Sequence, residues 1–177
     1  FPGSHSVKLM HEKLLNWKIN GELSVPVFDK SLRNGLGDRS HWRFENPDLL
    51  ILEGWFLGIE PYSIDINNRS INTENLSIDE SSYIQIIQKN LKEYLDIWNL
   101  IDNIWHLKPL KIEYMNMWKT NQEKEMFSQK GRALKDEKLS NFLRMLNVSI
   151  PHKSFEFINS YALLLIDQER NLIEAGL

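Results

Sequence analysis

No cysteine occurs among the 177 residues, which excludes disulfides, thiolate metal sites and cysteine nucleophiles. A chain without cysteine agrees with a reducing compartment, and we expect a cytoplasmic protein. No apolar run approaches the roughly 20 residues that a membrane-spanning helix requires. The opening residues Phe1–Ser4 lack the basic and apolar regions of a signal peptide. We therefore expect no membrane partner.

A strong excess of either charge is also missing from the sequence. The formal net charge is −3, so the chain as a whole does not attract nucleic acid, and we expect no nucleic-acid partner. The five histidines are too far apart for zinc-site spacing, and there is no Gly-x-Ser-x-Gly elbow of the kind found in hydrolases. A hydrophobic fraction of 42% with 25% charged residues is typical of a packed domain, and we expect residues 1–177 to form one.

Apolar spacing predicts strands that alternate with helices along the chain. The predicted helices are 4–17, 81–101, 112–130, 136–146 and a short one from residue 151, and the predicted strands are 23–28, 48–54, 103–107 and 161–167. Residues 29–47 and 63–82 show no periodicity and are predicted as a long loop and an irregular surface excursion, with a turn at Arg170-Asn171. Such alternation favours an α/β fold with a parallel sheet.

The most informative single residue is Glu53, which ends the apolar run of residues 48–54 just before Gly54. A continuous apolar run is typical of a strand buried on both faces of a parallel sheet. Ligands of open α/β sheets bind beyond the carboxyl ends of the strands, which would place Glu53 at the binding crevice. A carboxylate there can hold Mg²⁺ or one of its waters. The alternative is a glutamate that ends a strand and meets solvent.

Several motifs occur in a fixed order along the chain. Val25–Ser31 reads V-P-V-F-D-K-S, Gly35–Arg39 reads G-L-G-D-R, and Leu50–Gly58 reads L-I-L-E-G-W-F-L-G. Together they resemble the glycerate kinases of the phosphoribulokinase and uridine kinase group of P-loop kinases. Pro2–His5 and Ile166–Asn171 resemble the opening segment and the closing strand and turn of that family. The resemblance implies a three-layer α/β fold with the parallel sheet of P-loop kinases.

The resemblance also implies an activity, namely Mg²⁺-dependent transfer of the γ-phosphoryl group of ATP to a small hydroxyl acceptor, with D-glycerate expected. Such transfer depends on positioning and on neutralising charge. The implied catalytic residues are Glu53, which is also the metal ligand, and the cations Lys30 and Arg39. The implied substrate-binding residues are Ser4, His5, Asp29 and Asp38. The two aspartates are equally well explained as turn formers.

A lid over ATP is expected from the resemblance around residues 112–147, with Lys119 and Arg132 as candidate ATP contacts. Two positions depart from the family pattern. Ser6 stands where the family usually has Asp, which leaves the identity of the acceptor less determined. Lys119 stands where relatives often carry Arg.

One expected motif is absent from the sequence, the Gly-x-x-x-x-Gly-Lys-Ser/Thr loop whose backbone amides cradle phosphates. The chain also begins with Phe rather than Met. We therefore expect a further amino-terminal segment of the same protein to carry the P-loop and its strand, and we expect this chain alone to be inactive. The alternatives are a related kinase for a nucleoside, pantothenate or a sugar phosphate, a non-catalytic nucleotide-binding protein, and an inactive fragment.

Overall fold

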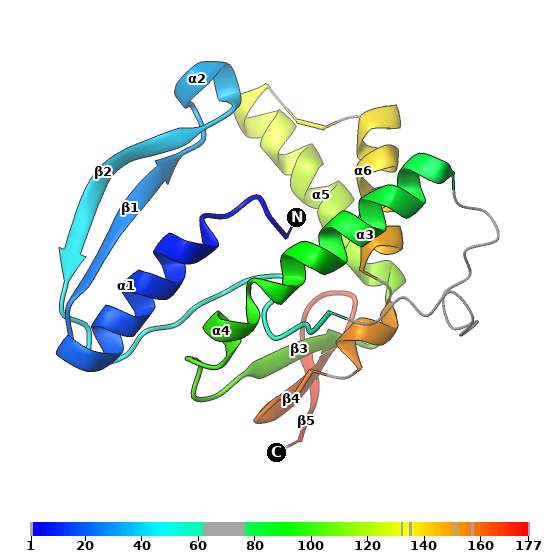
Figure 1. Cartoon of the computed structure of the whole chain (residues 1–177). Coiled ribbons are helices and arrows are strands. Elements are labelled where there is room, and N and C mark those ends of the chain that lie inside the picture. The colour runs from blue at the N-terminus through cyan, green and yellow to red at the C-terminus, as the bar shows by residue number, and fades with distance from the viewer. Residues whose placement is uncertain are drawn as a thin grey trace.

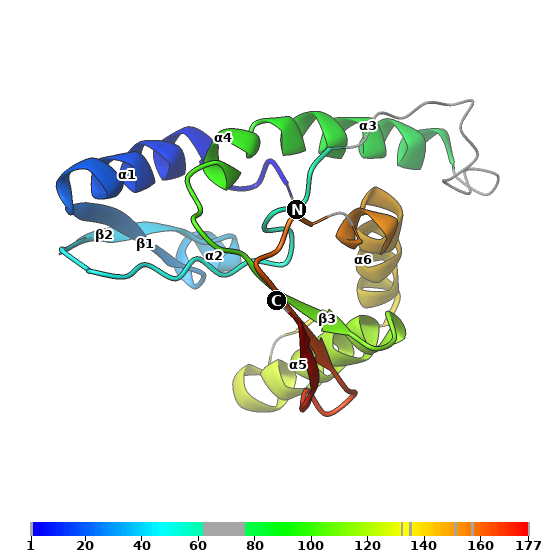
Figure 2. The ribbon, with the colours of Figure 1, turned by 90° about the horizontal axis from the view of Figure 1, so that it is seen from below.

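Helices and strands alternate through most of the chain, as Figures 1 and 2 show from two directions. The computed structural model describes residues 2–61, 77–131, 133–134, 136–150, 152–156 and 158–176. In chain order the elements are α1 (Val7–Asn20), β1 (Leu23–Asp29), α2 (Leu32–Gly35), β2 (Asp38–Glu45), α3 (Ile78–Lys92), α4 (Leu95–Trp98), β3 (Trp105–Pro109), α5 (Glu113–Lys130), α6 (Asp136–Ser149), the 3₁₀ helix η1 (His152–Phe155), β4 (Ala162–Ile166) and β5 (Leu172–Gly176). Helices α1, α4 and α3 follow one another along one side of the molecule (Figure 2).

The larger sheet has the strand order β3-β4-β5, in which β3 and β4 are parallel and β4 and β5 are antiparallel. Its middle strand β4 is buried at Ala162 and Ile166. A tight turn joins β4 to β5, because the Asp167 carboxylate accepts the Asn171 backbone N–H at 2.7 Å. The predicted α/β class and the predicted turn are confirmed, while the edge strand β5 was not predicted.

Most predicted elements lie close to their predicted positions. They are the helices at 4–17, 81–101, 112–130 and 136–146, the short helix from residue 151, and the strands at 23–28, 103–107 and 161–167. The prediction of a single helix at 81–101 is wrong in two respects: the range contains two helices, α3 and α4, and α3 begins earlier because Ser77 and Glu80 form a capping box. Residues 63–76 of the predicted surface excursion lie outside the described residues, and its last residues, 78–82, belong to α3.

The prediction of a loop over residues 29–47 is wrong, because β2 pairs antiparallel with β1 in a hairpin. The side chains of β2 are exposed almost throughout, so its sequence has no apolar alternation that would reveal a strand. Helix α1 packs against this hairpin: Lys13 Nζ lies 5.7 Å from the centroid of the Trp42 ring, and Trp17 Nε1 donates to the Pro47 carbonyl at 2.8 Å. A two-stranded ribbon is marginal by itself, and these contacts stabilise it.

The prediction of a strand at 48–54 is also wrong, since no strand pairing involves these residues within the described part of the chain. Leu49 and Ile51 are each 74% exposed, whereas Leu50 and Leu52 are partly buried. This alternation is typical of an extended segment with one covered face. The apolar run indicated two covered faces, but a strand also needs a neighbour for its backbone hydrogen bonds, and the described chain supplies none.

The buried side chains form two clusters, one on α3 and one just beyond its end. Ile87 and Leu91 of α3 pack with Ile59 and Ile150, and partly buried aromatic rings surround them. Tyr94, Val7 and Ile97 form the second cluster, where α1 meets α4. Helix α3 therefore packs on the segment that ends at Ile59, and Tyr94 and Ile97 beyond its end pack on the amino-terminal helix.

A charged contact links the start of α3 to α6. Arg144 Nε donates to Glu80 Oε1 at 2.5 Å, and Glu80 Oε2 also accepts the Ser77 backbone N–H at 2.8 Å. The hydrogen bond from Arg144, followed by that from Ser77, lowers the pKa of Glu80 from 4.5 to about 2.

Because the pKa of Glu80 is lower in the folded state, its contribution to stability is complete above about pH 4.5 and is lost as the pH falls towards 2. We expect the urea midpoint of the wild-type protein to fall across this window by more than that of Glu80→Gln. The matched control is Glu93→Gln, which removes an exposed charge at the other end of α3. An equal acid dependence in Glu80→Gln and wild type would contradict the prediction.

Candidate active site

The segment before α1 is held against α3 by backbone contacts. Asn90 Nδ2 donates to the Pro2 carbonyl at 3.2 Å, and the Gly3 N–H donates to the Tyr94 hydroxyl at 3.2 Å. Gly3 has a φ of +94°, and a Cβ at this position would lie 2.1 Å from Asn90 Nδ2. Only glycine combines this backbone conformation with so close an approach. The Pro2–His5 segment thus has a fixed backbone conformation, which sets the position of His5.

His5 is hydrogen-bonded to a buried tyrosine. Its Nδ1 lies 2.9 Å from the Tyr94 hydroxyl, and the two rings meet edge to face with centroids 6.1 Å apart. Tyr94 is 5% exposed. Burial is the main cause that lowers the pKa of His5 below its ordinary value, so the neutral imidazole predominates at pH 7.

The extended segment that carries Glu53 is fixed at its carboxyl end. Ile59 is fully buried, and its carbonyl accepts Trp98 Nε1 at 3.0 Å. Gly58 has a φ of +80°, and a Cβ there would lie 3.0 Å from Ile104. Glu53 itself is exposed, and its carboxylate makes no hydrogen bond or ion pair with any described residue. The carboxylate is therefore available to a ligand.

Glu53 and His5 line the same pocket, whose volume is about 210 Å³. The lining combines residues from the amino-terminal segment, the segment around Glu53 and the junction of α3 with α4. Its members are Pro2, His5, Met10, Leu52, Glu53, Gly54, Trp55, Phe56, Leu57, Leu91, Tyr94 and Trp98. Apolar walls with a few convergent polar groups are typical of small-molecule sites. This pocket brings together one carboxylate, which accepts hydrogen bonds, and one neutral imidazole.

The predicted substrate residues Asp29 and Asp38 bind their own neighbours in the hairpin. Asp29 accepts the Ser31 hydroxyl at 2.7 Å and the Ser31 N–H at 2.8 Å, and the hydroxyl bond is the main cause that lowers its pKa. Asp38 accepts the Arg39 N–H at 2.8 Å and lies 3.7 Å from Arg33 Nη1. These contacts fit the turn-forming alternative for both residues.

The predicted cations Lys30 and Arg39 are exposed, and neither is among the described residues that line the Glu53 pocket. Lys30 follows β1, and Arg39 lies opposite Phe28 near the start of β2. The positive charge of Lys30 makes a minor contribution to the lowered pKa of Glu123 on α5. Glu53 and His5 therefore meet in one pocket while the two cations lie on the hairpin.

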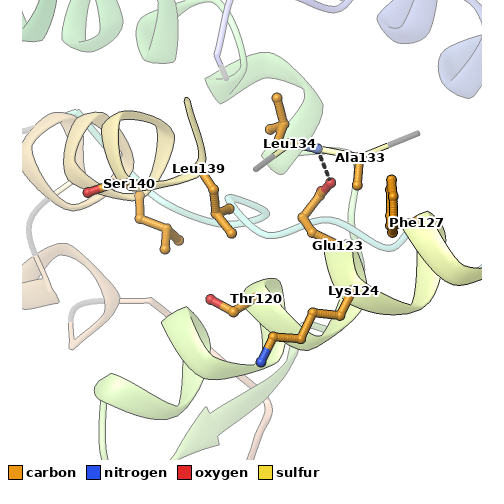
Figure 3. A pocket seen from close by; sticks show the side chains of 9 residues that line it. Thr120, Glu123, Lys124, Phe127, Ala133, Leu134, Leu139 and Ser140 are labelled. Atoms are coloured by element: carbon orange, nitrogen blue, oxygen red, sulfur yellow. Dashed lines mark hydrogen bonds between the residues drawn. The ribbon is translucent and has the colours of Figure 1, made fainter. Parts of the chain in front are cut away.

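A second pocket of about 560 Å³ lies between α5 and α6 (Figure 3). Glu123 lines it, is 4% exposed, and accepts the Leu134 N–H at 2.8 Å and Lys119 Nζ at 2.5 Å. Burial opposes the ionisation of Glu123, but the bonds from Lys119 and Leu134 and the charges of Lys119 and Lys30 outweigh it and lower the pKa. Glu123 therefore fastens the chain after α5 to the helix.

The remaining predicted residues are Ser4, Lys119 and Arg132. Ser4 is exposed, precedes His5, and is not among the lining residues. Lys119 points into the helix pair, since it bonds Glu123 and lies 5.5 Å from the centroid of the Phe142 ring. Arg132 lies outside the described residues.

Sequence reasoning missed Tyr94, which lies within the predicted helix 81–101. Its ring is buried in the core, and its hydroxyl bonds His5. A tyrosine rather than phenylalanine or leucine in an apolar stripe is the signal that could have revealed it, because a buried hydroxyl needs a partner. Trp55 and Trp98 also line the pocket.

Within the described ranges, no three His, Asp or Glu side chains gather in a way that could hold a metal ion. Mg²⁺ in kinase sites is held by one or two carboxylates together with substrate phosphates, and Glu53 fits the part of such a carboxylate. No helix in those ranges has both the length and the apolar character needed to cross a bilayer.

Two relatives in sequence are kinases by name. The "Uncharacterized kinase mug58" of Schizosaccharomyces pombe is 31% identical over 153 residues, which cover 80% of this chain and 53% of the relative. The "Probable ATP-dependent kinase TDA10" of Saccharomyces cerevisiae is 30% identical over 192 residues, which cover 97% of this chain and 63% of the relative. The chain thus spans between half and two thirds of the length of these relatives. No family model matches it.

Solved structures share the fold. The D-glycerate 3-kinase from Cryptococcus neoformans var. grubii superposes with a TM-score of 0.82 at 22% identity, over 99% of this chain and 68% of that chain. The YGR205w protein superposes with a TM-score of 0.70 at 26% identity, over 99% of this chain and 65% of that chain. The chain is thus similar in sequence to one protein named as a kinase and to one named as a probable ATP-dependent kinase, and it has the fold of a D-glycerate 3-kinase structure.

Proposed function

We propose that the whole protein is a cytoplasmic enzyme that transfers the γ-phosphoryl group of ATP, with Mg²⁺, to a hydroxyl of D-glycerate. The observation that carries the proposal is the pocket in which Glu53 meets His5. The names of the two relatives support a kinase, and the name of the relative from Saccharomyces cerevisiae supports ATP as the donor. The name of the structural neighbour supports D-glycerate as the acceptor.

The pocket offers the groups that phosphoryl transfer to an alcohol needs on the acceptor side. The Glu53 carboxylate can accept a hydrogen bond from the attacking hydroxyl or hold a water of Mg²⁺. The aromatic walls, which include Trp55 and Phe56, exclude water that would otherwise compete as the acceptor. A volume of about 210 Å³ suits a molecule of a few carbon atoms.

The cations and the lid form the second part of the proposal. Lys30 and Arg39 are assigned to the phosphates and to the acceptor carboxylate, which they would meet where the hairpin faces the bound substrates. Residues 112–147 are assigned to the lid over ATP. Lys119 is held by Glu123, so a contact from Lys119 to ATP would need that ion pair to open. Arg132 is the other assigned contact in this segment.

A further segment of the protein is part of the proposal, because the phosphate-binding loop does not occur in these 177 residues. Leu49 and Ile51 are 74% exposed, and Trp105 and Leu107 of β3 are 63% and 60% exposed. Within the described residues β3 pairs only with β4. Apolar side chains along two extended segments are well suited to cover an added strand, and we assign that place to the strand that leads into the P-loop.

The proposal is tested with the full-length protein, Mg-ATP and a panel of acceptors, in which ADP formation is measured. D-glycerate is expected to give the highest kcat/KM. Preference for a nucleoside, pantothenate or a sugar phosphate would replace D-glycerate but keep the kinase activity. Calorimetric binding of Mg-ATP with no turnover on any acceptor would instead favour a non-catalytic nucleotide-binding protein, and no binding would overturn the proposal.

A further inference from the structure

We infer that Tyr94 is a positioning residue that fixes the tautomer of His5, so that the Nε2–H of a neutral His5 is the hydrogen-bond donor offered to the acceptor molecule. The inference rests on the proposed function only in its last step, which identifies the molecule that accepts the hydrogen bond from His5 as the acceptor substrate. The first steps concern three groups in contact: the Gly3 N–H, the Tyr94 hydroxyl and the His5 ring.

The direction of the hydrogen bonds follows from the Tyr94 hydroxyl. Its oxygen accepts the Gly3 N–H at 3.2 Å, so the remaining requirement is an acceptor for its own hydrogen. Among the described residues the one hydrogen-bond acceptor on this hydroxyl is His5 Nδ1, at 2.9 Å. The side chain is 5% exposed, so water cannot readily replace His5. Tyr94 therefore donates to Nδ1.

The tautomer of His5 follows from that bond. A neutral imidazole carries one hydrogen, and a ring that accepts at Nδ1 carries it on Nε2. A protonated ring would need Tyr94 to accept a second hydrogen bond and would leave the tyrosine hydrogen without its partner. Partial desolvation of the His5 ring, which belongs to an exposed residue, acts in the same direction because it lowers the pKa. The nitrogen left for a ligand is therefore Nε2, as a donor.

Tyr94 is held firmly enough to impose this choice. Its ring packs with Val7 and Ile97 in the core and lies 5.5 Å from the Trp98 ring, centroid to centroid. Trp98 is in turn bonded to the Ile59 carbonyl at 3.0 Å. The hydroxyl is thus fixed in position by the core rather than by the pocket, and it orients His5 before any ligand binds.

The tautomer of His5 determines which hydrogen-bonding groups the acceptor molecule must carry. Glu53 can only accept a hydrogen bond while it is ionised, and a neutral His5 of this tautomer can only donate at Nε2. The two side chains line one small pocket. A molecule that satisfies both carries a hydroxyl, which donates to Glu53, and a neighbouring carboxylate, carbonyl or ether oxygen, which accepts from His5. Small hydroxy acids form such a class.

The first test reads the tautomer directly in full-length protein labelled with ¹⁵N-histidine. Long-range ¹H–¹⁵N spectra at pH 7 are expected to show His5 protonated at Nε2 and unprotonated at Nδ1. In Tyr94→Phe the two His5 nitrogen shifts are expected to move towards the average of a tautomer mixture. Tyr114→Phe, a tyrosine of α5 that stacks on Trp118, is the matched control and should leave them unchanged. The His5 signals are assigned by their loss in His5→Gln.

The second test is kinetic. Tyr94→Phe is expected to raise KM for the acceptor by about 10-fold, with a smaller change in kcat and an unchanged KM for ATP. The thermal midpoint serves as a check that the ring still packs. An Nδ1–H tautomer in the wild type, or an unchanged tautomer and KM in Tyr94→Phe, would overturn the inference. If His5 has the predicted tautomer but the protein phosphorylates no acceptor, the proposed function is wrong. The inferred effect of Tyr94 on His5 would still hold.

Discussion

Glu53→Gln is expected to lower kcat/KM of the full-length protein by about 10²- to 10⁴-fold. Glutamine keeps the shape of the side chain but removes the negative charge that can hold a water of Mg²⁺ or accept the proton of the attacking hydroxyl. Because Glu53 makes no hydrogen bond or ion pair with any described residue, the thermal midpoint should stay close to that of the wild type. The loss would then come from chemistry rather than from folding.

The matched control for Glu53→Gln is Glu60→Gln. Glu60 is exposed, lies seven positions further along the chain, and is absent from the lining of the pocket. Initial rates should be measured over a range of Mg²⁺ concentrations. If Glu53 holds the metal, Glu53→Gln should need a higher Mg²⁺ concentration than the wild type to reach half of its maximal rate. Wild-type kcat/KM in Glu53→Gln, or an equal loss in Glu60→Gln, would remove Glu53 from the catalytic assignment.

Ile87→Ala is expected to lower the free energy of unfolding by about 2–5 kcal/mol. Ile87 is 2% exposed and packs with Ile59, Leu91 and Ile150. Truncation to alanine therefore leaves a cavity where α3 packs on two other parts of the chain. Urea denaturation followed by circular dichroism measures the change. A loss below about 1 kcal/mol would mean that the cluster collapses around the smaller side chain.

Ile86 offers a control on the same helix with the same chemical change. It is 52% exposed, so Ile86→Ala should change the free energy of unfolding by no more than about 0.5 kcal/mol, the range usual for surface positions. Equal losses at positions 86 and 87 would show that helix propensity, rather than burial, governs the response of α3.

Several parts of this structure could be predicted from the sequence because their signal is local. The helical spacing of Ile84, Ile87 and Leu91 predicts α3, and the apolar run before Asp167 predicts β4. Glu53 was predicted as a site residue from its place at the end of an apolar run and from the resemblance, and His5 was predicted from the resemblance. The structure places both side chains in the lining of one pocket.

Other parts could not be predicted because they depend on partners distant in sequence. β2 is a strand only because β1 lies beside it, and its polar, exposed side chains carry no pattern of their own. Residues 48–54 have the composition of a strand but lack a neighbour within the described chain. The bond between His5 and Tyr94 joins positions 89 residues apart, which no local pattern reveals.

Tyr94 belongs to two parts of the molecule at once, since its ring fills the core and its hydroxyl reaches the pocket. A substitution of Tyr94 that changes ligand preference is therefore expected to change the stability of the fold as well. Evolution or engineering of a new preference has more freedom at Trp55, which is 47% exposed and lines the same pocket without belonging to either buried cluster. Among relatives that prefer different ligands, we accordingly expect the residue at the position of Trp55 to differ more often than the residue at the position of Tyr94.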